Sequence, residues 1–303
     1  MYLVKNVGFN KTTLFLAFLL LVTLVGCSTN KENKSDTVSS SKVERLDSLI
    51  RKDRKKFLSK LTLGIDSDLE KAQLIVKWLA INFDWKATDY KQRNVQQIIE
   101  RGGGNCNDLA KVTIDLINSA AIKIRKVREI NIHVTSKERQ KSANALVTEK
   151  GIKYSVFGKM HNDHVWIEIY DKNSKKWIPA DPSLGVIGVE NWMQSRVAFE
   201  KKKTLDPGSK DMIVPMAVYA EDENKKLTIN RTEYYLIHQF DKIYNNQLSK
   251  NPTWKDWSRS IKEMDDKCLL AFEGKLNLHM HLEEIEALSN LYGKMKIEFK
   301  NLK

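Results

Sequence analysis

One segment governs how this 303-residue sequence folds: Arg101-Gly102-Gly103-Gly104-Asn105-Cys106-Asn107-Asp108-Leu109-Ala110. Three glycines precede a cysteine, and apolar residues then recur at helical spacing, at Leu109, Val112, Leu116, Ile117 and Ala120. We therefore expect a helix that begins at or next to Cys106. Its unpaired N–H groups and dipole favour a thiolate there, and the glycines allow a sharp turn with room for a substrate. A small buried cysteine behind a flexible loop fits the same residues.

A second informative segment alternates polar and apolar residues from His164 to Tyr170, which is a strand pattern. The residues at 171–174 are Asp-Lys-Asn-Ser, which favour a turn, and a second strand runs from Lys175 to Asp181. If those four residues form the loop, Tyr170 faces Lys175 and His164 faces Asp181. Directly opposed side chains have Cβ atoms about 4.5–5.5 Å apart. The pattern predicts an imidazole beside a carboxylate, as a catalytic histidine needs, although a structural His–Asp hydrogen bond fits it too.

These segments together resemble the transglutaminase-like superfamily, whose fold is papain-like. The motifs that carry the resemblance are a glycine-preceded cysteine opening a helix, a His-x-Trp strand, a Trp-x-x-x-Asp-Pro strand and an upstream aromatic segment. In this sequence they read Gly104-Asn105-Cys106, His164-Val165-Trp166, Trp177-Ile178-Pro179-Ala180-Asp181-Pro182 and Trp78-Leu79-Ala80-Ile81-Asn82-Phe83-Asp84-Trp85. The resemblance covers residues 65–190. It implies an α+β fold, with helices packed on an antiparallel sheet.

The resemblance also implies the chemistry. Cys106 would be the nucleophile, His164 the general base, and Asp181 the group that orients it. Trp85 matches the aromatic that helps to hold the oxyanion. The implied reaction is acyl transfer through a thioester on peptide or protein amides, with water or an amine as the acceptor. A catalytically silent scaffold or binding module with the same fold is the alternative.

Two other histidine-containing segments offer alternatives to this assignment. His161, three residues before His164, is the competing base, and we expect it in a loop beside the cleft. The pair at 279 and 281 precedes two glutamates and suggests a metal site. Ligands two residues apart share a face only on a strand, whereas the residues over 283–291 have a helical pattern. We therefore expect neither a metal nor another cofactor.

The N-terminal residues resemble a bacterial lipoprotein signal. Lys5 and Lys11 precede an apolar run that ends in Leu24-Val25-Gly26-Cys27. The run falls short of the roughly 18 apolar residues of a spanning helix. The final four residues resemble a lipobox, in which the cysteine is acylated. We expect a signal peptide over 1–26 and lipidation of Cys27, which would anchor the protein in the cell envelope. Ser28 resembles the outer-membrane class, if the source has two membranes.

The composition and charge limit the classes of binding partner that we expect. The net charge is +13, from 51 Lys and Arg against 38 Asp and Glu. The lysines are spread along the chain, which suits anionic envelope polymers or lipid headgroups, or simply a solvated basic surface. No nucleic-acid motif accompanies the charge, so we expect no nucleic-acid partner. Cys268 lies among apolar residues and is expected in the core.

The remaining patterns suggest the domain limits. A polar, Ser- and Lys-rich segment is expected as a flexible tether over 27–58, followed by a catalytic domain over 59–225 and a helical extension over 226–303 without visible chemistry. Within the catalytic domain we expect helices over 67–82 and 94–100, strands within 122–134, a loop over 136–152 and completion of the sheet over 186–220.

The lipobox-like segment leads to a first prediction. The protein extracted from membranes should begin at Cys27 and carry an acylated N-terminus, measured as intact mass. A C27A variant should lose the lipid mass and leave the membrane fraction. An unmodified wild-type product that is cleaved elsewhere would show the lipid assignment to be wrong.

Overall fold

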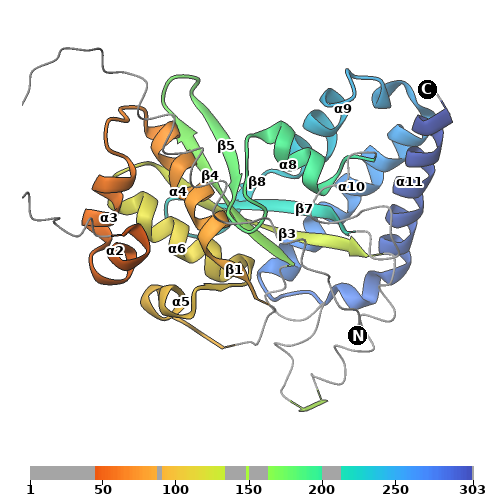
Figure 1. Ribbon diagram of the computed structural model, residues 1–303. Helices are drawn as coiled ribbons and strands as arrows, with labels where there is room; N and C mark the ends of the chain where they lie inside the picture. Colours follow the sequence, from red (N-terminus) through yellow and green to blue (C-terminus); the bar gives the residue numbers. More distant parts are fainter. Residues whose placement is uncertain (1–44, 87–90, 134–147, 150–162, 200–212, 302–303) are drawn as a thin grey trace, which may run out of the picture. The chain divides into compact units, whose positions relative to one another are not determined.

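The computed structural model centres on a six-stranded antiparallel sheet in the order β6-β5-β4-β3-β7-β8 (Figure 1). It describes residues 45–86, 91–133, 148–149, 163–199 and 213–301. The strands are β3 (Ile124–His133), β4 (His164–Asp171), β5 (Lys176–Asp181), β6 (Val186–Ile187), β7 (Ile213–Glu221) and β8 (Leu227–Asn230). A short parallel pair joins β1 (Asp84–Trp85) to β2 (Gly103–Gly104). The expected α+β fold with an antiparallel sheet is confirmed.

The N-terminal helices pack on one face of this sheet (Figure 1). They are α2 (Leu46–Lys52), α3 (Arg54–Leu61), α4 (Asp68–Asn82), α5 (Val95–Arg101) and α6 (Cys106–Ser119). Alternate residues of β4 join their hydrophobic core, namely Val165, Ile167 and Ile169. The other residues of β4 point away from these helices, because successive side chains of a strand face opposite sides.

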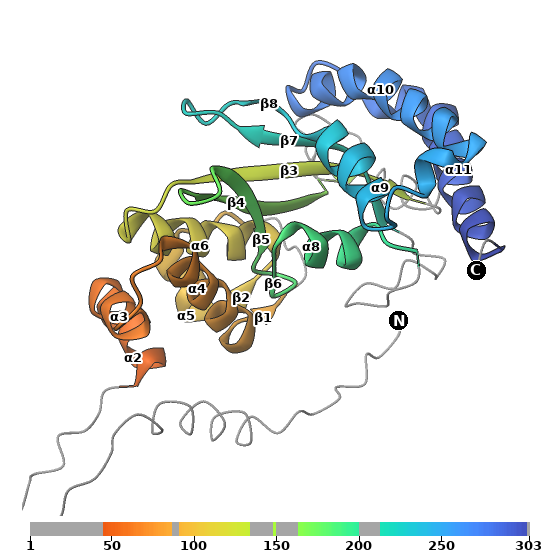
Figure 2. The same cartoon turned by 90° about the horizontal axis from the view of Figure 1, so that it is seen from above.

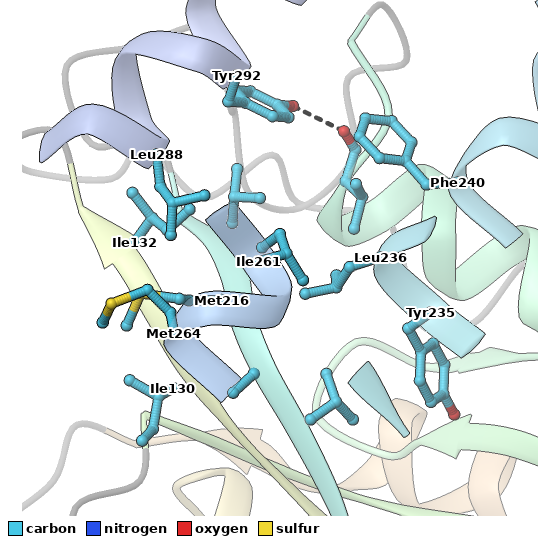
Figure 3. Packing of buried hydrophobic residues seen from close by; sticks show 14 of the residues in the cluster. Ile130, Ile132, Met216, Tyr235, Leu236, Phe240, Ile261, Met264, Leu288 and Tyr292 are labelled. Carbon is cyan, nitrogen blue, oxygen red and sulfur yellow. Dashed lines mark hydrogen bonds between the residues drawn. The ribbon is translucent and has the colours of Figure 1, made fainter. Parts of the chain in front are cut away.

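A second hydrophobic core lies on the opposite face, beneath the C-terminal helices (Figures 1 and 2). The elements here are α8 (Val189–Arg196), η2 (Tyr234–Gln239), α9 (Phe240–Lys242), η3 (Leu248–Lys250), α10 (Pro252–Phe272), η4 (Leu278–His281) and α11 (Leu282–Asn301). Figure 3 shows Ile130 and Ile132 of β3 close to side chains from α10 and α11. The Tyr292 hydroxyl donates to the Val197 carbonyl oxygen at 2.7 Å. The expected place of Cys268 in the core is confirmed.

This second core corrects the expected boundary at 225/226. The region beyond it was expected to be helical, but β8 pairs with β7 and completes the sheet. Helices α10 and α11 then share one hydrophobic core with β3 and β7. The helical segment is therefore an integral layer of the fold, because the sheet would otherwise expose the apolar face of β7.

The helical part of the chain also begins earlier than expected. Helices α2 and α3 occupy residues that the polar composition assigned to a flexible segment over 27–58. Four apolar side chains in them are buried, at Leu49, Ile50, Phe57 and Leu58. The Asp53 side chain caps α3 by accepting from the Lys56 amide at 3.0 Å. The signal and Cys27 lie outside the described residues, as do His161 and most of the loop expected over 136–152. Every helix within the described ranges is too short or too polar to span a membrane.

The helices that precede the cysteine agree with their sequence signals. Helix α4 is capped by Ser67 and buries the predicted face of Ala72, Ile75, Val76 and Leu79. Helix α5 begins after Asn94, whose side chain and Gln97 form a reciprocal capping box. These caps define where each helix starts, and α5 leads directly into the glycine run.

The register of the β4–β5 hairpin differs from the expected one by two residues. Tyr170 pairs with Trp177 instead of Lys175, and Asp171 pairs with Lys176. Asp171 stays in β4 because its carboxylate accepts from the amides of Asn173 and Ser174 at 3.1 and 3.2 Å, which moves the turn one residue along. A shift of two residues preserves the faces of both strands. His164 and Asp181 therefore become diagonal neighbours, which long side chains can still bridge.

The glycine run is required by backbone conformation and by close packing. Gly102 ends α5 in the left-handed region, with φ 70°. Gly103 has φ 140°, and a Cβ there would overlap the Asp84 backbone across the β1–β2 pair. A Cβ on Gly104 would lie 2.6 Å from Asp108 Oδ2. The run lets β1 and the first turn of α6 approach closely, while the expected room for a substrate stays a prediction.

Because Cβ atoms have no space here, Gly104→Ala should lower the free energy of unfolding by about 1–3 kcal/mol. Gly293→Ala is the matched control, since it lies in α11 with nothing within 4 Å of its added Cβ. That change should raise stability by about 1 kcal/mol, since glycine is a poor helix former. Urea unfolding monitored by circular dichroism measures both. Equal effects at the two positions would contradict the packing argument.

Candidate active site

Cys106 is the first residue of α6 and is half-buried. The Asn105 side chain caps the helix by accepting from the Asp108 amide at 3.0 Å. The apolar residues predicted for this helix bind it to the sheet, with Leu109, Val112, Leu116 and Ile117 buried. The expected helix start at the cysteine is confirmed. Its thiol therefore lies where free N–H groups and the helix dipole favour negative charge.

His164 and Asp181 form a buried pair at the open end of the hairpin. The His164 Nε2 atom and an Asp181 carboxylate oxygen lie 2.6 Å apart. The other carboxylate oxygen accepts from the Ser183 amide at 3.0 Å and from its hydroxyl at 2.7 Å. The His164 ring also stacks against Trp166, with centroids 5.8 Å apart. The contact predicted from the hairpin is confirmed, although it is diagonal across the strands.

This environment keeps His164 positively charged. Burial by itself lowers the pKa of His164, but the Asp181 carboxylate more than compensates and raises it to about 10. Burial disfavours the charged form of Asp181. The positive charge of His164 and the hydrogen bonds that Asp181 accepts nevertheless hold the pKa of Asp181 below its ordinary value. Each partner thus stabilises the charged form of the other. At neutral pH the pair is an imidazolium and a carboxylate.

The thiol and the imidazolium are electrostatically linked. Cys106 is among the groups that raise the pKa of His164, so negative charge on the sulfur favours the protonated ring. With Nε2 turned to Asp181, Nδ1 is the ring nitrogen left for the thiol. A separation of about 3–4 Å between Sγ and that nitrogen stays a prediction.

Lys126 is a component that the sequence did not suggest. It lies on β3 and donates to Asn107 Oδ1 at 3.0 Å, in the first turn of α6. Burial, followed by repulsion from Arg128, lowers its pKa to about 8. Cys106 acts in the opposite direction and stabilises its charge. A lone lysine in a strand carries no motif, so only the packing of β3 against α6 identifies it as a cation near the nucleophile.

Trp85 lies beside the glycine run, as its expected role requires. Its backbone pairs with Gly104, two residues before Cys106. The Lys86 amide donates to the Gly104 carbonyl oxygen at 2.9 Å and extends this pairing. The Trp85 side chain is 61% exposed. Its indole can therefore meet a substrate at the surface, while the oxyanion role stays a prediction.

The remaining sequence candidates have structural roles or lie outside the described residues. His161 is among the latter, so its competition with His164 stays open. His281 Nδ1 lies 3.0 Å from Glu284 Oε1, one helical turn away. Within the described ranges, no three His, Cys, Asp or Glu side chains come together as a metal site needs.

Comparisons with known proteins show what the chain is similar to. Residues 55–182 match the profile of the transglutaminase-like superfamily. A candidate cysteine protease from Cytophaga hutchinsonii is 18% identical with a TM-score of 0.31, over 47% of this chain but only 40% of its own. LapG of Legionella pneumophila is 10% identical with a TM-score of 0.34, over 66% of this chain and 86% of its own. Rad4–Rad23 bound to a 6-4 photoproduct UV lesion is 14% identical with a TM-score of 0.35, over 84% of this chain and 55% of its own. No curated protein sequence matches the chain.

The two cysteines of the folded part should differ in reactivity. We expect iodoacetamide to alkylate Cys106 roughly tenfold faster than Cys268 or more, because thiolates and exposed thiols react first. Cys268 is fully buried, and burial raises its pKa well above the ordinary value. The measurement is peptide mass spectrometry over time at pH 7. In the D181N variant the Cys106 rate should fall towards that of an ordinary thiol. Equal rates for both cysteines would contradict the site.

Proposed function

We propose that this protein is a cysteine acyltransferase or peptidase acting on peptide or protein amides. The proposal is supported by the match of residues 55–182 to the transglutaminase-like superfamily profile. One observation carries the proposal. A buried His164–Asp181 ion pair is electrostatically linked to a thiol at the N-terminus of α6. A merely structural histidine would need neither the linked thiol nor a second, fully hydrogen-bonded carboxylate oxygen.

The residues provide each proton transfer of a thioester mechanism. The Cys106 thiolate attacks the amide carbonyl carbon, and the carbonyl oxygen becomes an oxyanion. His164 then gives its proton to the leaving nitrogen as the C–N bond breaks, which leaves a thioester. The neutral ring next takes a proton from water or an amine as that group attacks the thioester. The C–S bond breaks and the thiolate returns.

Asp181 orients the ring and stabilises its charged form through both halves of this cycle. Backbone N–H groups at the start of α6 are free of helical partners and suit the oxyanion. Trp85 adds an indole N–H, which is a donor only and so cannot compete for the proton. Lys126 adds positive charge where the thiolate and oxyanion form.

We further propose that the domain works at the bacterial cell envelope, held by a lipid on Cys27. The support is the lipobox-like Leu24-Val25-Gly26-Cys27 and the net charge of +13, which suits a surface of anionic polymers or headgroups. The polar residues after Cys27 space the domain from the lipid, and the described helices begin at Leu46. Its substrates are accordingly envelope peptides or proteins.

Mass spectrometry of the reaction products distinguishes hydrolysis from acyl transfer. Purified protein is incubated with a glutamine-containing peptide, with and without a primary amine. Hydrolysis should give the glutamate peptide or cleaved fragments, and transfer should give an amine adduct. Both products should vanish in C106S, and D181N should lower turnover by about 10⁴-fold. No product from the unchanged protein would indicate a catalytically silent scaffold, and equal product from C106S would exclude Cys106 as the nucleophile.

A separate prediction concerns Trp85. If its indole donates to the oxyanion, Trp85→Phe should lower kcat by about 10²–10³-fold with little change in KM. Ile81→Ala is the matched control, because Ile81 is 62% exposed at the end of α4 and has no donor. A similar loss in both variants, or none in Trp85→Phe, would show that the indole only contributes surface.

A further inference from the structure

A second buried ion pair lies beside the catalytic one. Glu129 of β3 is directly opposite His164 of β4 in the sheet register. Its carboxylate accepts from the guanidinium of Arg196, the last residue of α8. Arg196 also lies 3.4 Å from Asn131 Oδ1. The side chains of Glu129 and Arg196 are 0% and 2% exposed, so water screens neither charge.

The pair is costly for the fold by ordinary standards. Glu129 Oε2 and Arg196 Nε are buried and make no hydrogen bond among the described residues. Buried charges with unsatisfied atoms add little to stability, because desolvation offsets their attraction. Replacing such a pair by apolar residues of similar size is often neutral or stabilising. Such a pair therefore suggests a role other than packing.

The charges of this pair act on the catalytic residues. Arg196 lowers the pKa of His164 and also that of Asp181. Burial raises the pKa of Glu129, and Arg196 followed by His164 opposes that rise. The guanidinium keeps its charge at any accessible pH, so direct contact with it favours the ionised carboxylate. By reciprocity, the Glu129 carboxylate favours protonated His164 while Arg196 disfavours it.

We infer that Arg196 and Glu129 are positioning residues that set how readily His164 releases its proton. The inference rests on the proposed function, in which His164 must protonate the leaving nitrogen. Asp181 from β5 and Cys106 from α6 both hold the proton on the ring. Arg196 from α8 is the opposing charge, and Glu129 from β3 keeps it in place. Asp163, next to His164, adds negative charge to the same region.

The Glu129–Arg196 pair would keep His164 acidic enough to protonate the leaving nitrogen. A histidine held too firmly in its charged form stabilises the thiolate but is a poor acid towards the leaving nitrogen. Repulsion from Arg196 weakens that hold without breaking the hydrogen bond to Asp181. Because α8 also packs on β5, its last turn supplies the charge from a rigid position. His164 can then serve both halves of the cycle.

The test measures the His164 titration in the full chain by NMR, with the signal assigned by its loss in H164Q. Glu129→Gln keeps the shape and leaves Arg196 uncompensated, so the titration midpoint should fall by about one pH unit. Arg196→Gln removes the repulsion, so the midpoint should rise. Arg196→Lys keeps a cation and should lie close to the unchanged protein. The alkaline limb of the kcat/KM profile should move in the same directions.

Opposite shifts in two variants of one pair are the discriminating result, since a merely structural pair would not give them. Arg231→Gln is the matched control. It breaks the contact with buried Glu168, about 13 Å further along β4, and should leave the His164 midpoint unchanged. If Arg196→Gln fails to fold by circular dichroism, Glu129→Gln alone decides. An unchanged or raised midpoint in Glu129→Gln would overturn the inference. Shifted midpoints in a protein without turnover would support it while refuting the proposed function.

Discussion

The contact between His164 and Asp181 is the constraint on which the rest of the site depends. A buried imidazole would ordinarily lose its proton, and a buried carboxylate would ordinarily gain one. Placed 2.6 Å apart, each keeps the other charged, and both carboxylate oxygens have hydrogen-bond partners. The chain thereby holds a cation in an almost water-free position, where it is electrostatically linked to the Cys106 thiol. A guanidinium could supply the charge, but it could not also give up and take back a proton as an imidazole does.

Two features of the fold bring the thiol to this pair. The glycine run lets the chain leave α5, pass β1 and enter α6 without side chains in the way, so Cys106 starts a helix packed on the sheet. The second hydrophobic core covers the opposite face of the same strands, where His164 and Glu129 point. The C-terminal helices therefore contribute to the site, since α8 delivers Arg196 to it.

Much of this could be predicted from short-range patterns. The starts of α4, α5 and α6 follow from caps and helical periodicity, and the hairpin follows from alternation around a polar turn. The register was wrong by two residues because Asp171 uses its side chain to cap the turn while its backbone stays in β4. Each side chain was still assigned to the correct face of the sheet, because the register error was an even number of residues. Lys126, Glu129 and Arg196 could not be found, because charged residues in strands and helices acquire meaning only when distant segments pack together.

The most direct test of the account is to isolate the acyl-enzyme. A glutamine peptide or its activated ester is mixed with the protein, quenched in acid and digested, and the Cys106 peptide is weighed. The account predicts a mass gain equal to the acyl group on Cys106, which hydroxylamine removes as it does other thioesters and which D181N forms more slowly. No gain on Cys106, or an equal gain on Cys268, would contradict it.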